Sequence, residues 1–173
     1  LKRASQKVAI IMKRTRLDPI DRKILIALQE DGRITNVDLA KKAGISAPPC
    51  LRRVRALEEA GFIDSYHATL NAQKLGFGIT VFAHVSLQSH NDVDIKKMEA
   101  QLALWPQVRE AHLLTGETDM LLKIVAPDWE AYQQFLTTEL QGTPNVESVR
   151  SSIAIRASKI APGVPLEETE DKA

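Results

Sequence analysis

Apolar residues recur at the spacing of a helix in three short segments near the start of the chain. The first opens with Asp18-Pro19, an N-cap acceptor followed by a proline at a position that needs no amide hydrogen. The second begins after Thr35 and runs to Gly44, a residue suited to the left-handed turn that ends many helices. The third, which Ser46 can cap, has two prolines in its first turn. The pattern therefore predicts helices within residues 18–32, 35–44 and 46–61.

A turn of only three residues, 44–46, separates the second predicted helix from the third. Such a short glycine-containing turn forces the helices to cross steeply, as in a helix-turn-helix, whose second helix enters the major groove of DNA. On the third helix, Arg52 is predicted to point away from the buried side, with Arg53 and Arg55 flanking it. Guanidinium groups in this position can bind phosphates or guanine edges with two hydrogen bonds.

The opposite side of the third helix is predicted to be buried and to consist of Cys50, Leu51, Val54 and Leu57. A small thiol among apolar residues is typical of a core position. A redox role for Cys50 would require a stabilised thiolate. We therefore interpret this cysteine as a core residue.

In the second half of the chain, strand-like alternation of apolar and polar residues gives way twice to helical spacing. Strands are predicted at residues 79–87, 108–114, 120–126 and 146–155, and helices at 92–105 and 128–140. The order β-α-β-β-α-β is that of a ferredoxin-like unit, in which helices cover one face of an antiparallel sheet. The fold class is therefore α+β. The uncovered face needs a partner, and self-association is the simplest source of one.

The remaining segments divide the chain into five predicted parts. Residues 62–70 are rich in β-forming residues and are predicted to be either a wing strand or the connector to the second domain. The end of the chain is acidic and is predicted to be poorly ordered. The parts are a flexible basic arm (1–16), a winged helix-turn-helix domain (17–64), a connector strand and hinge (65–78), a second domain (79–160) and an acidic tail (161–173).

Charge is divided unequally along the chain, although the net charge is only +1. Residues 1–70 hold 14 Lys and Arg against 8 Asp and Glu, a net charge of 14 − 8 = +6. Residues 71–173 hold 9 and 14, a net charge of 9 − 14 = −5. A basic front half joined to an acidic back half indicates that only the front half meets a polyanion. Together with the helix-turn-helix pattern, this predicts double-stranded DNA as a partner.

Composition argues against several other classes of protein. Hydrophobic residues make up 44% and charged residues 26%, as in ordinary globular proteins, and no apolar run approaches the roughly 20 residues that cross a bilayer. A single cysteine excludes an intrachain disulfide, and the four histidines show no metal-ligand spacing. We therefore predict a cytoplasmic protein that uses no membrane, metal or cofactor.

Together the segments resemble the Lrp/AsnC family, the leucine-responsive and feast–famine transcription regulators of bacteria and archaea. The most specific stretches are LDPIDRKILIALQEDGRITNVDLAKKAGISAPPCLRRVRALEEAGFI and HLLTGETDMLLKIVAPD. The resemblance implies a winged helix-turn-helix followed by the ligand-sensing domain called RAM. It also implies homodimers that pair their sheets and assemble into larger rings such as octamers. The DNA contacts that it implies are Ser46, Pro48, Arg52, Arg53 and Arg55.

The resemblance further implies a site for a small effector, usually an amino acid, between the sensing domains of neighbouring dimers. Asp119 can pair with an α-ammonium group, while amide groups around Gly116 can take a carboxylate. Met120 and Ser152 stand where some relatives have aromatic or bulkier residues, so the effector's identity stays open. The matching positions are Leu113, Thr115, Gly116, Glu117, Thr118 and Asp119 on one loop, and Ser152, Ile153 and Ala154 on the last strand.

Two alternative functions use the same architecture. Sirohaem decarboxylases of the haem pathway combine these two domains with a decayed DNA-binding half, but they need histidines or arginines around a large tetrapyrrole cavity. The arginine-bearing helix and the few basic residues of the second half favour a regulator. A ligand-independent architectural DNA-binding protein would differ in lacking an effector response. The arginines can also be read as a solvated helix face, and the loop at 115–119 as an ordinary hairpin turn.

Overall fold

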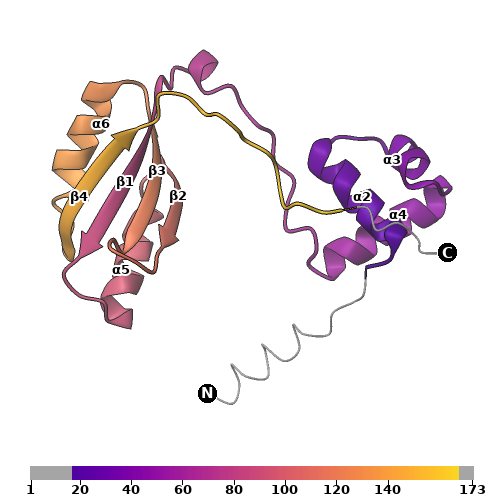
Figure 1. Cartoon of the computed structure of the whole chain (residues 1–173), viewed down its shortest axis with the longest axis horizontal. Coiled ribbons are helices and arrows are strands. Elements are labelled where there is room, and N and C mark those ends of the chain that lie inside the picture. Colours follow the sequence, from indigo (N-terminus) through magenta and orange to yellow (C-terminus); the bar gives the residue numbers. More distant parts are fainter. Residues whose placement is uncertain (1–16, 168–173) are drawn as a thin grey trace. The chain divides into compact units, whose positions relative to one another are not determined.

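The computed structural model describes residues 17–167 and divides them between two units, each described here by itself (Figure 1). One unit contains the chain up to Thr69 together with the segment that begins at Ile160, and the other is Leu70–Lys159. The predicted basic arm at 1–16 and the last six residues of the predicted acidic tail lie outside the described residues. Within residues 17–167, no helix is both long and apolar enough to cross a membrane.

Three helices form the centre of the first unit: α2 (Pro19–Glu30), α3 (Asn36–Ala43) and α4 (Ala47–Glu59). Asp18 and Asp21 make a reciprocal capping box at the start of α2, and the Thr35 side chain caps α3 by accepting from the Asp38 amide. Gly44 ends α3 with φ of 74°, in the left-handed region that glycine tolerates. The three predicted helices and the three-residue turn between the last two are confirmed.

A compact cluster of buried side chains holds the three helices together. Its members are Ile24, Leu25, Ala27, Leu39, Ala40, Ala43, Cys50 and Leu57. Cys50 is fully buried, as predicted, and burial raises the pKa of its thiol against the opposing charge of Arg53. The prediction for Leu51 is wrong, because this side chain is 41% exposed. The buried stripe of α4 is narrow and follows Cys50, Val54 and Leu57, so a residue one step beyond Cys50 lies outside it.

The β-prone residues 62–70 adopt neither a helix nor a paired strand in the structure. Phe62 N donates to Leu57 O at 2.9 Å, which closes the end of α4, and Tyr66 Oη donates to the Glu58 carboxylate at 2.9 Å. Within the described chain, the predicted connector strand therefore lacks the neighbouring backbone that a strand requires. A short 3-10 turn, Gln73–Leu75, follows near the start of the second unit.

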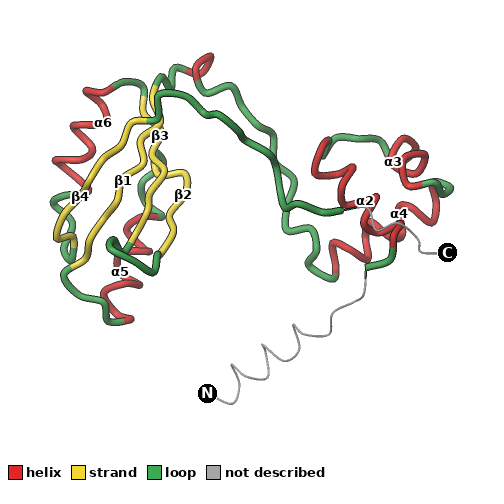
Figure 2. Tube along the Cα trace, in the orientation of Figure 1, coloured by secondary structure: helices red, strands yellow, loops and turns green. Residues whose placement is uncertain are grey.

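The second unit is a four-stranded antiparallel sheet (Figure 2). Its strands are β1 (Ile79–Leu87), β2 (Val108–Leu113), β3 (Met120–Ala126) and β4 (Val146–Ile153). They lie in the order β2-β3-β1-β4, and every neighbouring pair is antiparallel. This order is that of the ferredoxin-like fold, so the α+β prediction is confirmed.

Two helices cover one face of this sheet (Figure 1). They are α5 (Asp92–Leu102) and α6 (Trp129–Phe135), the second of which continues into the π-helical turn Leu136–Leu140. Alternate residues of the two central strands are buried beneath them: Val81, Ala83, Val85, Leu87, Met120, Leu122, Ile124 and Ala126. The alternating residues Phe82, Leu121 and Val125 occupy the opposite face and are only partly buried.

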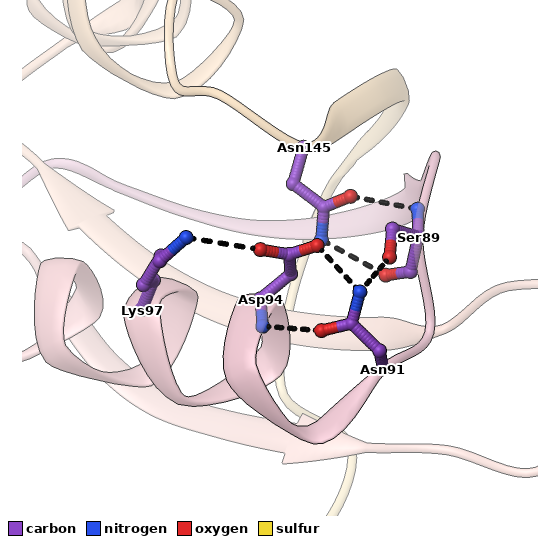
Figure 3. A network of polar contacts seen from close by, with 5 residues as sticks. All are labelled: Ser89, Asn91, Asp94, Lys97 and Asn145. Carbon is purple, nitrogen blue, oxygen red and sulfur yellow. Dashed lines mark hydrogen bonds and ion pairs between the residues drawn. The ribbon is translucent and has the colours of Figure 1, made fainter.

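A network of polar contacts fastens the end of β1 to the start of β4 (Figure 3). Asn145 Oδ1 accepts from Ser89 N at 2.7 Å, and Asn145 Nδ2 donates to Ser89 O at 3.0 Å. Asn91 caps α5 through the Asp94 amide, and Lys97 pairs with the Asp94 carboxylate at 3.2 Å. The network fixes the loop that carries the chain from the sheet into α5.

The segment from residue 160 to 167 differs most from its prediction as a poorly ordered tail. It contacts α2: Val164 N donates to Gln29 Oε1 at 2.8 Å, and Gln29 Nε2 donates to Val164 O at 3.1 Å. Leu166 packs against the buried cluster of the three helices. Acidity and prolines at the chain end suggested disorder, but the backbone of Val164 and the side chain of Leu166 supply a docking contact.

Candidate nucleic-acid interface and effector site

The outer face of α4 is the exposed surface formed by Pro48, Leu51, Arg52 and Arg55. Residues 48, 52 and 55 are separated by four and three positions and therefore share one side of a helix. Ser46 is the N-cap residue, but its side chain makes no capping hydrogen bond, unlike the expectation from sequence. The structure thus brings four of the five predicted DNA contacts together at the exposed beginning and outer side of α4.

Arg53 takes a different direction from its neighbours. One of its guanidinium nitrogens lies 2.6 Å from an Asp18 oxygen and 2.7 Å from an Asp21 oxygen, so it binds both acids of the α2 capping box. The hydrogen bonds that Arg53 donates to Asp21 and Asp18 raise the pKa of its guanidinium group. Partial burial disfavours the charged form of Asp18, but the Asp21 amide and Arg53 outweigh it and hold the Asp18 pKa below its ordinary value. This guanidinium links α4 to the beginning of α2.

Leu51 is a candidate DNA contact that sequence reasoning missed. It lies beside Arg52 on the outer face of α4 with 41% of its surface exposed. Apolar side chains at such positions can contact the methyl group of thymine in the major groove. The spacing from Cys50 could have revealed it, because a step of about 100° places Leu51 beside the buried stripe and not within it.

The effector loop, residues 114–119, joins β2 to β3. Leu114 N donates to Asp119 O at 2.8 Å, which closes the loop at its base. Gly116 has φ of 157° within an exposed stretch that also contains Thr115 and Glu117. Thr118 is 9% exposed, so the second half of the loop turns back into the fold. The six predicted effector positions from Leu113 to Asp119 are therefore gathered at one end of the sheet.

Asp119 already has partners within its own chain. One carboxylate oxygen accepts from Leu87 N at 2.7 Å, the other lies 2.7 Å from His90 Nε2, and Asp119 N donates to Val85 O at 3.0 Å. The Leu87 amide and the His90 ring hold the pKa of Asp119 below its ordinary value, so the group is ionised at neutral pH. The Asp119 side chain is 22% exposed and that of His90 is 65% exposed, so the His90 contact is open to solvent.

The structure does not bring the two predicted groups of effector residues together within one chain. Ile153 pairs with Val81, whereas Met120, directly after the effector loop, pairs with Val85. Positions 81 and 85 on β1 are four residues apart, which is about 13 Å along a strand. Ser152 and Ile153 are exposed on the edge strand β4, so a second subunit would be needed to join both groups in one site.

Family models match both units of the chain. The model described as winged helix-turn-helix DNA-binding matches residues 17–64, and the model described as Lrp/AsnC ligand binding domain matches residues 80–164. The chain is also 52% identical over 148 residues to the leucine-responsive regulatory protein of Rhizobium meliloti, with 86% of this chain and 95% of that protein aligned. The chain belongs to the Lrp/AsnC family of transcription regulators. This Lrp/AsnC regulator is 40% identical to the Bkd operon transcriptional regulator of Pseudomonas aeruginosa, over 87% of this chain and 98% of that one.

Solved structures of the family share the fold of this regulator. A transcriptional regulator of Neisseria meningitidis in complex with L-Met matches with a TM-score of 0.83 and 37% identity, covering 87% of this chain and 97% of that one. An AsnC family transcriptional regulator of Agrobacterium tumefaciens matches with a TM-score of 0.81 and 35% identity over the same shares of the two chains. The resemblance stated from the sequence and the assignment as a DNA-binding regulator with an effector domain are confirmed.

Proposed function

We propose that this Lrp/AsnC regulator binds duplex DNA by placing the outer face of α4 in the major groove. The observation that carries the proposal is the exposure of Arg52 and Arg55 on the same side of the helix as Pro48. Both arginines would contact phosphates or guanine edges, and Leu51 would contact a thymine methyl group. Ser46 and Pro48 would meet the DNA backbone at the helix N-terminus, where free amide groups favour phosphate.

Arg52→Ala should weaken binding to an operator, which can be obtained by selecting duplexes from a random pool with the parent protein. If Arg52 neutralises one phosphate, the slope of log Kobs against log salt concentration should fall by about 0.9. The matched control is Arg109→Ala, which removes an exposed arginine from β2 in the second unit. Unchanged affinity and unchanged slope in Arg52→Ala would contradict the groove assignment.

We propose that the effector is an amino acid or a similar small molecule held at the effector loop. Amide groups around Gly116 would bind its carboxylate, and its ammonium group would replace the exposed His90 ring at Asp119. Two relatives support this class of effector, because one is named leucine-responsive and another was solved with L-Met. Ser152, Ile153 and Ala154 of a second copy would complete the site.

A thermal-shift screen with the twenty amino acids and with 2-oxo acids tests this effector assignment. Specific binding stabilises the folded state, by about 2.7 kcal/mol when the ligand is at 100 times its Kd. We expect L-leucine or L-methionine to raise the unfolding temperature, and the 2-oxo acid with the same side chain, which lacks the ammonium group, not to do so. No shift with any amino acid would favour the ligand-independent architectural alternative.

We propose a homodimer that pairs its sheets and assembles further, to an octamer or similar ring, and a regulator without catalytic activity. The relatives matched above are named as a regulatory protein or as transcriptional regulators, which supports this reading over the decarboxylase alternative. Absorbance spectra after incubation with sirohaem check the alternative directly. A stoichiometric bound tetrapyrrole spectrum would argue for an enzyme.

A further inference from the structure

The last described segment of the chain, residues 160–167, is here called the strap. It belongs to the unit of the DNA-binding helices, although it follows directly on the sensing domain in sequence. The last backbone hydrogen bond to the sheet runs from Ala154 N to Thr80 O at 2.9 Å. The chain therefore passes between the two units twice, once near Thr69 and once near Lys159.

The strap binds α2 through two hydrogen bonds between one side-chain amide and the backbone of one residue. The single Gln29 side chain satisfies both backbone polar groups of Val164, at 2.8 and 3.1 Å. Leu166 N donates to Val164 O at 2.8 Å, which bends the strap so that the Leu166 side chain packs on the helical cluster. One polar and one apolar contact thus fix both the position and the direction of the strap.

The sequence of the strap fits this docked conformation. Gly163 has φ of 66°, and a Cβ atom at this position would displace the Gln29 amide from its hydrogen bonds with Val164. Only glycine meets both conditions without strain. Pro162 and Pro165 limit the backbone freedom on either side, which lowers the entropy lost on docking. The combination describes a segment built to lie on α2.

We propose that the strap is the coupling element of this regulator, tying the end of β4 to α2 so that strap docking, DNA binding and effector binding are thermodynamically linked. The proposal rests on the proposed function. The chain and its contacts connect the two sites. Strand β4 carries Ser152 and Ile153, the strap that follows it binds α2, and the start of α2 binds Arg53 of α4. In this proposal, a change at the sheet edge would reach α4 through the covalent chain, the strap and α2.

Two variants break the contact from opposite sides. Gly163→Ala adds the clashing Cβ on the strap and leaves α2 unchanged, whereas Gln29→Ala removes both hydrogen bonds from the helix side. The matched control is Gln133→Ala, the same substitution at an exposed position of α6 in the other unit. Hydrogen exchange followed by mass spectrometry on the full chain reports docking of residues 160–167. We expect exchange in this segment to be at least tenfold faster in both variants and unchanged in the control.

The linkage between strap docking, DNA binding and effector binding is measured in the same variants, with a selected operator duplex and L-methionine as probes. Coupling is reciprocal, so operator should change strap exchange in the parent, and both variants should change operator Kd severalfold. The ratio of operator Kd values with and without L-methionine should move toward one in the variants. If residues 160–167 exchange as fast in the parent as in the variants, the strap is not docked. If the variants exchange faster but keep the parental operator Kd, the strap is not coupled to DNA binding.

The outcomes separate this inference from the proposed function. Failure of the parent to bind any selected duplex would contradict the DNA-binding proposal itself. A parent that binds operator without responding to any amino acid would contradict the effector proposal, while the effect of Gly163→Ala on operator Kd would still decide whether the strap is coupled to DNA binding. If Gln29→Ala weakens α2 itself, Gly163→Ala gives the decisive result, because it alters no residue of the three helices.

Discussion

Arg52 and Arg53 are neighbours on α4, yet their side chains have different partners. Arg52 is exposed, whereas Arg53 is bound to the two carboxylates at the start of α2. Three arginines within four positions indicated one DNA-binding surface, but the direction of the Arg53 side chain depends on acids 32 and 35 residues earlier in the chain. Helical spacing gives the side of the helix from which a side chain leaves. It does not give the partner that a long side chain reaches.

We therefore expect Arg53 to position α4, and its substitution should leave a signature different from that of Arg52. Arg53→Lys keeps the charge but loses the planar fork that serves two acids at once. It should lower the unfolding temperature and weaken operator binding, while the salt slope stays at the parental value because no phosphate contact is lost. A reduced salt slope in this variant would show that Arg53 leaves the acids and contacts DNA.

The same contact predicts a dependence of stability on pH. The Asp18 pKa is lowered in the folded protein. The ionised carboxylate therefore stabilises the fold above the unfolded pKa of about 4, and this stabilisation is lost as pH falls through the folded pKa. Thermal unfolding measured from pH 6 downward should show a smaller acid-induced loss in Asp18→Asn than in the parent. Identical pH profiles would mean that the Asp18 contact contributes nothing to stability.

Asp119 offers a second test at the residue scale. Asp119→Asn keeps an oxygen that can accept from Leu87 N but removes the negative charge that would attract an ammonium group. We expect the fold to survive and the affinity for L-methionine or L-leucine to fall at least tenfold by calorimetry. Glu99→Gln, at an exposed position of α5 outside the predicted effector site, should retain the parental affinity. Parental amino-acid affinity in Asp119→Asn would exclude Asp119 as the ammonium ligand.

At the scale of elements, the helices and strands follow from local patterns, but the segments that join them do not. Prolines, caps and glycines placed α2, α3 and α4 correctly, because these signals act within a few residues. The strap was predicted to be poorly ordered, because its partner Gln29 lies 135 residues away and an isolated Pro-Gly segment has no local reason to be ordered. The resemblance implied an effector site shared between neighbouring subunits, but the separation of the effector loop from the end of β4 within one chain depends on strand pairing, which no local pattern gives.

Asn145 shows how one residue can fix the junction of two elements. Its φ is 76°, in the left-handed region, and its side chain pairs with both backbone polar groups of Ser89 (Figure 3). Asn145→Gly keeps the backbone conformation and loses the side-chain bonds, at a cost of about 1–3 kcal/mol for two hydrogen bonds. Asn145→Ala should cost roughly 1–2 kcal/mol more, because alanine is strained at positive φ.

Urea unfolding of the full chain, followed by a signal from the sensing unit, measures these differences. The expected order of stability is parent, Asn145→Gly and then Asn145→Ala. Ser148→Ala, at an exposed position on β4, is the control and should unfold near the parental midpoint. If Asn145→Ala is as stable as Asn145→Gly, the positive φ at this position does not strain an alanine residue.

At the scale of the whole molecule, the proposed assembly would supply both the open sheet face and the proposed effector site with a partner from another chain. The sheet face opposite α5 and α6 carries Phe82, Leu121 and Val125, which no helix of the described unit covers. The effector loop and the end of β4 lie apart within one chain. A second copy can cover the open face, and further copies can bring β4 of one subunit to the loop of another. Assembly and effector binding should therefore be lost together.

Leu121→Arg tests this dependence. Leu121 pairs with His84 and His112 across neighbouring strands, on the sheet face opposite the helices, so in a twofold pair that buries this face an added cation would be desolvated and would face its own copy. We expect a smaller mass by light scattering and no stabilisation by L-methionine, with circular dichroism unchanged. Ala100→Arg, on the exposed side of α5, adds the same charge away from the sheet and should change neither mass nor response. A Leu121→Arg variant that stays assembled would exclude this face as the interface. A dissociated variant that still binds L-methionine would show that one chain holds the effector without help from a second.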